Sequence, residues 1–229
     1  MPISVSAAQI HRSAERRTRR ESTRNRSQPT PYITQAIQID PKNVLAYVRL
    51  GGIYQSQGET DTALAQYAKA IDLQPKSASL ITMVGNVYLE KNDFESARKY
   101  YARALEADPD FAVANANMAW IDAENGKDLD VALAMAQKAE SLMPEHPSVT
   151  DVLGWVMYKR GNYRGAIPLL ESCVKKTPDS AQFRYHLGMA LMAAGQTAPA
   201  RAQLQLAVHT NKLRAADQAE AEKALAQRD

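Results

Sequence analysis

Cysteine and histidine are scarce in this sequence of 229 residues, and their scarcity excludes several kinds of site. Cys173 is the only cysteine, so the chain can form no intrachain disulfide and no cysteine-based zinc site. No glycine-rich phosphate loop follows a strand-like segment. The histidines are scattered without the spacing of metal ligands: His11, His146, His186 and His209. The sequence therefore predicts no metal, no cofactor and no catalytic residue.

Residues that could suggest chemistry have simpler interpretations. Cys173 follows Ser172 at a position where alanine recurs elsewhere in the chain, and a free cysteine packs like a small hydrophobic residue. His186 is expected to be a polar surface residue rather than a base. Asp128 and Asp130 flank an irregular loop, where a solvated or helix-starting role is expected. We therefore expect a protein that is not an enzyme.

Long apolar runs are also lacking. No segment approaches the roughly 18 apolar residues that a membrane-spanning helix needs. The first thirty residues have no apolar stretch of the kind found in a secretory signal. The expectation is a protein without a transmembrane segment that stays in the cytoplasm. If the chain is a fragment of a longer protein, the cell envelope is the alternative.

The net charge of +3 is distributed unevenly along the chain. Residues 1–29 carry seven arginines and two glutamates, a net of +5, and the remainder carries a net of −2. This composition predicts a disordered basic arm at residues 1–29. The arm has no aromatic residues interleaved for stacking on bases, so no nucleic-acid partner is expected.

A period of about 34 residues organises the rest of the chain, and a fixed period in this range is the signature of a repeat architecture. Within each period the apolar residues fall at i, i+3, i+4 and i+7, which is one face of a helix. Prolines recur with this period, at Pro41, Pro75, Pro109, Pro144 and Pro178. Small residues keep the same spacing, at Gly51, Gly85, Ala119, Gly154 and Gly188. The third period has one extra residue near Lys127.

The side chains around these markers resemble those of tetratricopeptide repeat proteins. The first repeat reads Tyr47, Leu50, Gly51, Tyr54, Gly58, Ala63, Tyr67, Ala70 and Pro75. The resemblance covers residues 30 to about 210 and implies an all-α, right-handed superhelical solenoid of helix-turn-helix repeats. The small residue of each first helix should let its neighbour approach closely. Segments beginning at Asp151 and Arg184 look like bacterial members, which tilts the expected origin toward bacteria.

The repeats divide the chain into four predicted parts. After the arm, residues 30–43 match the second helix of a repeat whose first helix is not recognisable. Residues 44–213 form five complete repeats, and residues 214–229 form a C-terminal capping helix. Its outer side is expected to carry Asp217, Glu220, Glu222 and Lys223.

The resemblance also implies where a partner would bind, because first helices of such repeats line the concave surface. Trp120 and Trp155 occupy the same register in adjacent repeats, so they are expected close together and exposed on the groove wall. The same large residues could instead fill the space between successive first helices. The residues predicted to bind a partner are Asn86, Trp120, Asp151, Trp155, Tyr158, Tyr185 and Met189.

Two functions follow as hypotheses. The first is a scaffold or adaptor that binds a protein or peptide segment in the concave groove of repeats 3–5. The second is an assembly module, a homo-oligomer included, that stacks through its open N-terminal end, in a bacterial envelope or exopolysaccharide-associated complex. A receptor for carboxyl-terminal peptides is disfavoured because Asn86 has no matching basic residues in neighbouring repeats.

Overall fold

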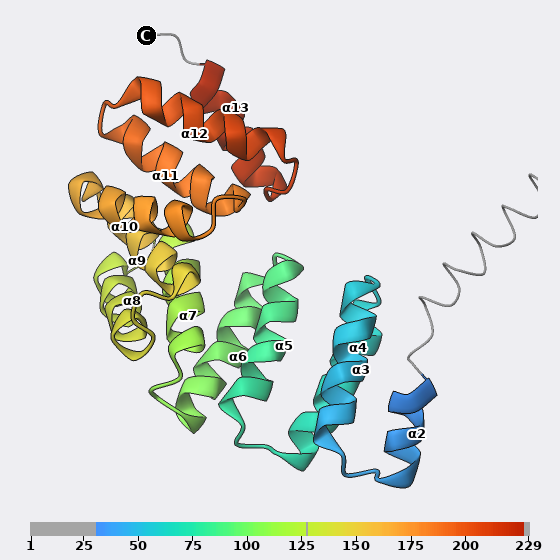
Figure 1. Ribbon diagram of the computed structural model, residues 1–229. Coiled ribbons are helices and arrows are strands. Elements are labelled where there is room, and N and C mark those ends of the chain that lie inside the picture. The colour runs from blue at the N-terminus through green and yellow to red at the C-terminus, as the bar shows by residue number, and fades with distance from the viewer. Residues whose placement is uncertain (1–30, 127, 227–229) are drawn as a thin grey trace, which may run out of the picture.

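The computed structural model describes residues 31–126 and 128–226, which form twelve α-helices and no strand. The predicted basic arm and Lys127 lie outside the described residues. Figure 1 shows the helices following one another as an arched solenoid, which confirms the predicted all-α repeat fold. Their bounds are α2 Pro31–Ile39, α3 Val44–Ser56, α4 Thr60–Leu73, α5 Ala78–Glu90, α6 Phe94–Ala107, α7 Ala112–Glu124, α8 Leu129–Leu142, α9 Pro147–Lys159, α10 Tyr163–Lys176, α11 Ala181–Ala193, α12 Thr197–His209 and α13 Ala215–Ala226.

Polar residues fix the starts of several helices. Asn43 precedes α3, and its side chain accepts a hydrogen bond from the backbone N–H of Ala46. Such caps satisfy backbone donors that have no partner within the helix. The same arrangement is made by Ser77, Asp93, Asn162 and Ser180 at the starts of α5, α6, α10 and α11.

The turn inside each repeat requires a left-handed backbone. Gly58 has φ +76° after α3, and Gly161 has φ +79° after α9. Glycine adopts this conformation without a steric penalty, as predicted for these helix ends. The second repeat has Asn92 at this position with φ 57°, since asparagine tolerates the left-handed region better than most residues.

Close packing within each repeat depends on the small residue of the first helix. A Cβ atom added to Gly85 of α5 would lie 2.5 Å from Cε1 of Tyr101 in α6. The large partner of each glycine is buried, and the prediction of a close approach is confirmed. The other pairs are Gly51 with Tyr67, Gly154 with Leu170 and Gly188 with Leu204.

Adjacent glycines in α3 allow a test of this packing. Gly51→Ala places a methyl group 2.6 Å from the Tyr67 ring, and overpacking of this kind is expected to cost about 1–3 kcal/mol of unfolding free energy. Gly52→Ala is the matched control, because its nearest neighbour is the Tyr67 hydroxyl at 3.8 Å. This control should gain about 0.5–1 kcal/mol from reduced backbone entropy. Urea denaturation of both variants measures the difference, and equal effects would contradict the packing model.

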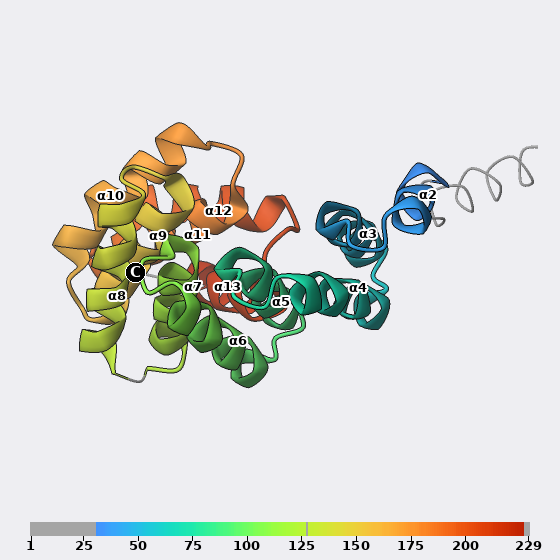
Figure 2. The ribbon, with the colours of Figure 1, turned by 90° about the horizontal axis from the view of Figure 1, so that it is seen from below.

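The first helices of repeats 2–5, namely α5, α7, α9 and α11, contribute residues to the inner side of the arch. The first helices of the five repeats keep the sequence period, and the start of α13 follows the start of α11 by one further period. The starting residues are Val44, Ala78, Ala112, Pro147, Ala181 and Ala215. The last helix therefore takes the place of a first helix in a further repeat. Figures 1 and 2 show α13 at the C-terminal end of the solenoid, where it packs beside α11 and α12.

The two ends of the solenoid differ. α13 packs against α11 and α12 and buries Asp217, Ala221 and Ala224. α2 packs against α3 but has no buried residue, and its Tyr32 and Ile39 are 81% and 77% exposed. In the described part of the chain, no helix combines the length and the apolar character needed to cross a membrane.

Cys173 is fully buried in α10, which confirms its interpretation as a small packing residue. Its Sγ lies 3.3 Å from the carbonyl oxygen of Pro147, to which the thiol donates a hydrogen bond. Burial raises the pKa of this thiol to about 12. The reactive thiolate is therefore suppressed at neutral pH.

Candidate partner-binding groove

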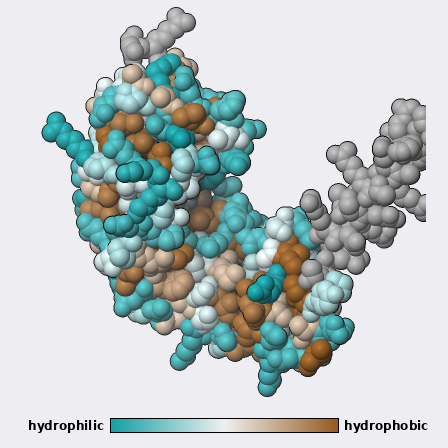
Figure 3. Space-filling view, in the orientation of Figure 1, coloured by the Kyte–Doolittle hydropathy of each residue, from teal (hydrophilic) through white to brown (hydrophobic). Residues whose placement is uncertain are grey.

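The inner side of the arch contains an open cavity of about 990 Å³. It lies where the C-terminal ends of α5 and α7 meet the first turns of α9, α11 and α13. Figure 3 shows the surface of the molecule hollowed between its C-terminal and N-terminal repeats. Its apolar wall consists of Leu89, Phe94, Trp120, Val152 and Phe183. Its charged and polar lining consists of Glu90, Asn92, Glu124, Ser148, Asp151, Gln182, His186 and Arg214. We call this cavity the groove.

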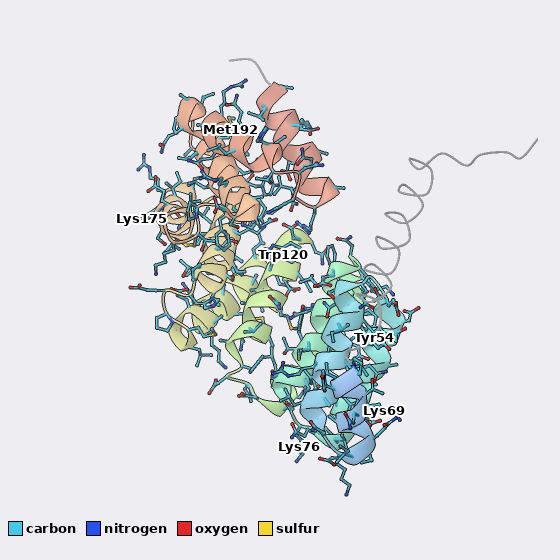
Figure 4. All side chains as sticks on the ribbon, turned by 45° about the vertical axis from the view of Figure 1, so that its right-hand side comes forward. Tyr54, Lys69, Lys76, Trp120, Lys175 and Met192 are labelled. Carbon is cyan, nitrogen blue, oxygen red and sulfur yellow. The ribbon has the colours of Figure 1, made fainter. Side chains whose placement is uncertain are left out.

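Trp120 is the large aromatic residue of the groove wall. It is half-buried, and Figure 4 places it between the two arms of the arch, whereas Lys175 lies on the outer side. Phe94 meets its ring edge-to-face, with ring centroids 5.8 Å apart. The guanidinium carbon of Arg214 lies 4.4 Å from the ring centroid, a cation–π contact. This position agrees with the predicted placement of Trp120 on the concave surface.

Glu124 joins the two tryptophans through charged and polar contacts. Its Oε1 accepts a hydrogen bond from Trp155 Nε1 at 2.8 Å, and its Oε2 accepts one from Arg214 at 3.0 Å. The Lys159 ammonium lies 3.5 Å from Oε1. Burial alone would raise the pKa of Glu124, but the bond from Trp155 and the cations Lys159 and Arg214 outweigh it, so the pKa is lowered. Glu124 is thus a carboxylate at neutral pH.

Arg214 fixes the start of the last helix to the groove. Besides Glu124, its guanidinium donates to both carboxylate oxygens of Asp217, at 2.6 and 2.8 Å. Burial alone would lower the pKa of Arg214, but the bonds and charges of Asp217 and Glu124 outweigh it and raise the pKa. These contacts connect α7 to α13 across 90 residues of sequence.

The prediction that Trp155 is exposed is wrong. Its side chain is 1% exposed because α9 and α11 lie close together at this level. The indole stacks on His186, with ring centroids 4.0 Å apart, and on Tyr158 at 4.7 Å. Trp155 therefore belongs to the core. This agrees with the alternative prediction that large residues at this position fill the space between successive first helices.

Burial also corrects the predicted exposure of Asp151, Tyr185 and Met189. Asp151 is buried against His186, whose Nδ1 lies 2.8 Å from Asp151 Oδ2. Tyr185 is fully buried and donates a hydrogen bond from its hydroxyl to Glu220 at 2.7 Å. Burial and the Glu220 charge raise the pKa of Tyr185. Asp151 contacts α11 and Tyr185 contacts α13, so the repeat register alone overestimated the exposure of these positions.

Asn86 and Tyr158, the other two predicted residues, do not line the groove. The Oδ1 atom of Asn86 accepts hydrogen bonds from the Tyr101 hydroxyl and from Asn117 Nδ2, and Asn86 does not line the groove. Tyr158 is half-buried and lines a separate hollow of about 370 Å³ with Met189, between α9, α11 and α13. Burial, followed by the charge of Glu220, raises the pKa of Tyr158 to about 12. Trp120 and Asp151 are therefore the predicted residues that line the groove itself.

Several residues of the groove were missed or misplaced by sequence reasoning. His186 was expected on the surface, but it is buried between Asp151, Gln182 and Trp155. Asp217 was expected on the outer side of the last helix, but it is buried because α13 packs like a further first helix. The start of α13 one full period after that of α11 was the available signal. No pattern pointed to Phe94, Glu124, Phe183 or Arg214.

Comparison with known families decides which fold family this architecture represents. Three models described as tetratricopeptide repeat match residues 43–110, 82–147 and 157–227, which together make up most of the chain. The chain belongs to the tetratricopeptide repeat family. No curated protein sequence matches it significantly. Members of this family are protein-interaction scaffolds, and the fold is typical of non-catalytic proteins.

Solved structures of tetratricopeptide repeat proteins share the fold. YrrB, described as having an unusual peptide-binding site, is 21% identical with a TM-score of 0.55, and the match covers 83% of this chain and 97% of YrrB. PilW, described as a type IV pilus biogenesis factor, is 21% identical with a TM-score of 0.66, covering 90% and 94%. The pilF protein of Pseudomonas aeruginosa is 21% identical with a TM-score of 0.60, covering 80% and 87%. At these identities the likeness concerns the fold.

Proposed function

We propose that this protein is a non-enzymatic scaffold that holds an extended or helical segment of a protein partner in the groove of repeats 3–5. The observation that carries the proposal is the half-buried Trp120 on an open, largely apolar groove wall. Tryptophan in such a setting is a typical centre of binding energy at protein interfaces. The neighbouring rings of Phe94 and Phe183 extend the apolar wall that a partner side chain would contact.

The open shape of the groove favours a peptide segment. Its volume of about 990 Å³ is at the upper end of the range of about 300–1,000 Å³ typical of small-molecule pockets and is large enough for several side chains of a peptide. The groove is open along the inner side of the arch, so an extended chain can enter without a large rearrangement. The buried Trp155 holds two lining residues of the groove in place, because its indole donates a hydrogen bond to Glu124 and stacks on His186.

Partner capture by a Trp120→Ala variant tests the proposal. Loss of a hot-spot tryptophan is expected to weaken partner binding by about 2 kcal/mol or more, roughly a 30-fold change in affinity. Tyr100→Ala is the matched control, since Tyr100 is also a half-buried aromatic residue, stacked on Tyr88 and outside the groove. Proteins from the source organism are captured on the immobilised chain and quantified. Equal capture by Trp120→Ala and wild type would refute the groove as the binding surface.

The second candidate function, assembly through the N-terminal end, is favoured by a different observation. Tyr32, Ile39 and Leu45 are large apolar residues that are exposed on α2 and α3. PilW is named as a pilus biogenesis factor, and this supports an envelope location for the assembly proposal over a cytoplasmic one. Sedimentation of the full chain and of Ile39→Glu tests the proposal. A monomer in both samples at high concentration would exclude self-association through this end.

A further inference from the structure

The charges around the groove are predominantly acidic. Among the described residues that line it, Glu90, Glu124 and Asp151 carry carboxylates and Arg214 is the single arginine or lysine. Glu90 is exposed at the rim, and its Oε2 accepts a hydrogen bond from Gln55 at 2.7 Å. Because Glu124 is already paired with Arg214, an acidic partner segment would meet the like charges of Glu90 and Asp151, which disfavours its binding. A basic segment would meet charges of the opposite sign.

The chain itself shows how the groove accommodates a guanidinium group. The Arg214 guanidinium lies over the Trp120 ring at 4.4 Å from its centroid and bonds to Glu124 at 3.0 Å. These contacts combine a cation–π interaction with a charge-assisted hydrogen bond. The surface that Trp120 and Glu124 present is therefore suited to a basic side chain next to an apolar one.

Asp151 offers a second acceptor in the lining of the same groove. Its side chain is 5% exposed, and its Oδ2 atom is bonded to His186. Its Oδ1 atom is buried and has no hydrogen-bond partner among the residues that the structure describes. A buried carboxylate oxygen without a donor is unfavourable, so a donor supplied by a bound partner would stabilise it.

Building on the proposed function, we propose that the partner segment is basic and apolar, and that it presents an arginine or lysine to Asp151 and Glu90 beside an apolar side chain that contacts Trp120 and Phe183. The acidic lining supplies the charge complementarity, and the unpartnered Asp151 oxygen supplies the acceptor. The occupant is a segment of a separate protein. Arg214 competes in part with the basic side chain of the partner, because the Arg214 guanidinium already neutralises the Glu124 carboxylate.

Selection from a random library of displayed twelve-residue peptides on the full chain tests the proposal. We expect the recovered peptides to contain an arginine or lysine next to an aromatic or aliphatic residue. A synthetic copy of the best peptide and its arginine-to-citrulline or lysine-to-norleucine version are then titrated by fluorescence anisotropy. The neutral version should bind at least about tenfold more weakly. Recovery of peptides without a basic residue would overturn the proposal.

Variants of the chain separate charge recognition from folding. Asp151→Asn and the rim variant Glu90→Gln should each weaken the basic peptide several-fold while leaving the neutral peptide unchanged. Arg214→Gln should tighten the basic peptide, because it removes the competing cation, whereas Arg214→Lys should not. Glu106→Gln, an exposed change outside the groove, is the matched control. Unchanged binding by both Asp151→Asn and Glu90→Gln would overturn the proposal.

Further outcomes distinguish this proposal from the proposed function. If the selected peptides ignore charge but lose affinity in Trp120→Ala, the basic specificity fails and the groove remains the binding surface. If the peptides are insensitive to every groove variant, both proposals fail. Self-association of the full chain that disappears in Asp151→Asn would mean that a second copy fills the groove, which overturns the proposal of a separate partner.

Discussion

Trp155→Ala is expected to lower the free energy of unfolding by about 3–5 kcal/mol, the usual cost of removing a large buried aromatic residue. The indole is almost completely buried between α9 and α11, where it stacks on His186 and Tyr158. The substitution also removes the hydrogen bond that Trp155 donates to Glu124, which leaves a half-buried carboxylate with fewer donors. Urea denaturation followed by circular dichroism measures the loss.

Two further variants serve as controls for this prediction. Trp155→Phe keeps an aromatic ring in the core but removes the hydrogen bond to Glu124, so a smaller loss of about 1–3 kcal/mol is expected. Trp120→Ala, in the same register one repeat earlier, should cost less than Trp155→Ala because its ring is only half-buried. A stable Trp155→Ala protein alongside an unfolded Trp120→Ala protein would reverse our assignment of core and groove.

Tyr101→Ala is the second substitution for which a large loss is expected, again about 3–5 kcal/mol. The ring of Tyr101 is fully buried against Gly85, and its hydroxyl donates to Asn86 Oδ1 at 2.8 Å. Asn117 donates to the same oxygen atom at 2.9 Å, so Tyr101 also supports the contact between repeats 2 and 3. Alanine would leave a cavity beside a glycine that has no side chain to fill it.

Tyr101→Leu is the matched control, because leucine occupies this position in repeats 4 and 5, at Leu170 and Leu204. Leucine should refill much of the space against Gly85 but lose the hydrogen bond to Asn86, at a cost of about 0.5–1.5 kcal/mol plus residual packing loss. Thermal and urea unfolding distinguish the two variants. If alanine and leucine were equally damaging, the hydroxyl rather than ring packing would dominate this contact.

The sequence predicts the helical hairpins well because each repeat carries its own local signals. Gly58 and Gly161 mark left-handed turns, and in the four repeats whose first helix carries a glycine at the packing position, that glycine meets a large residue of the second helix. These interactions join residues of a single hairpin, such as Gly85 and Tyr101. The period therefore determines them without any knowledge of how the repeats curve.

Exposure of the groove residues depends on contacts between repeats, and here the period was insufficient. Trp120 and Trp155 share a register, but different residues follow them one repeat later. Tyr185 and His186 pack over Trp155, whereas the equivalent positions beside Trp120 hold Asp151 and Val152. These smaller side chains leave the Trp120 face to the groove and to Arg214. Whether a tryptophan at this register is buried therefore depends on which residues the next repeat places over it.

The path of the last helix was the other feature that the period did not reveal. A terminal helix was predicted near Ala215, but its polar residues were assigned to an outer side. Arg214 instead donates hydrogen bonds to Glu124 and Asp217, and Glu220 accepts one from Tyr185, because α13 takes the place of a sixth first helix. A long-range ion pair of this kind is formed by the fold and has no local sequence signature.

Photo-crosslinking from defined positions tests the central claim most directly. Benzoylphenylalanine is placed at Ala216, an exposed residue that lines the groove, at Val131, an exposed residue of α8 outside it, and at Tyr32 of the open N-terminal end. The groove proposal predicts a crosslinked partner from position 216 and none from position 131 or 32. Crosslinking from position 131 or 32, with none from position 216, would contradict the claim that the groove holds the partner.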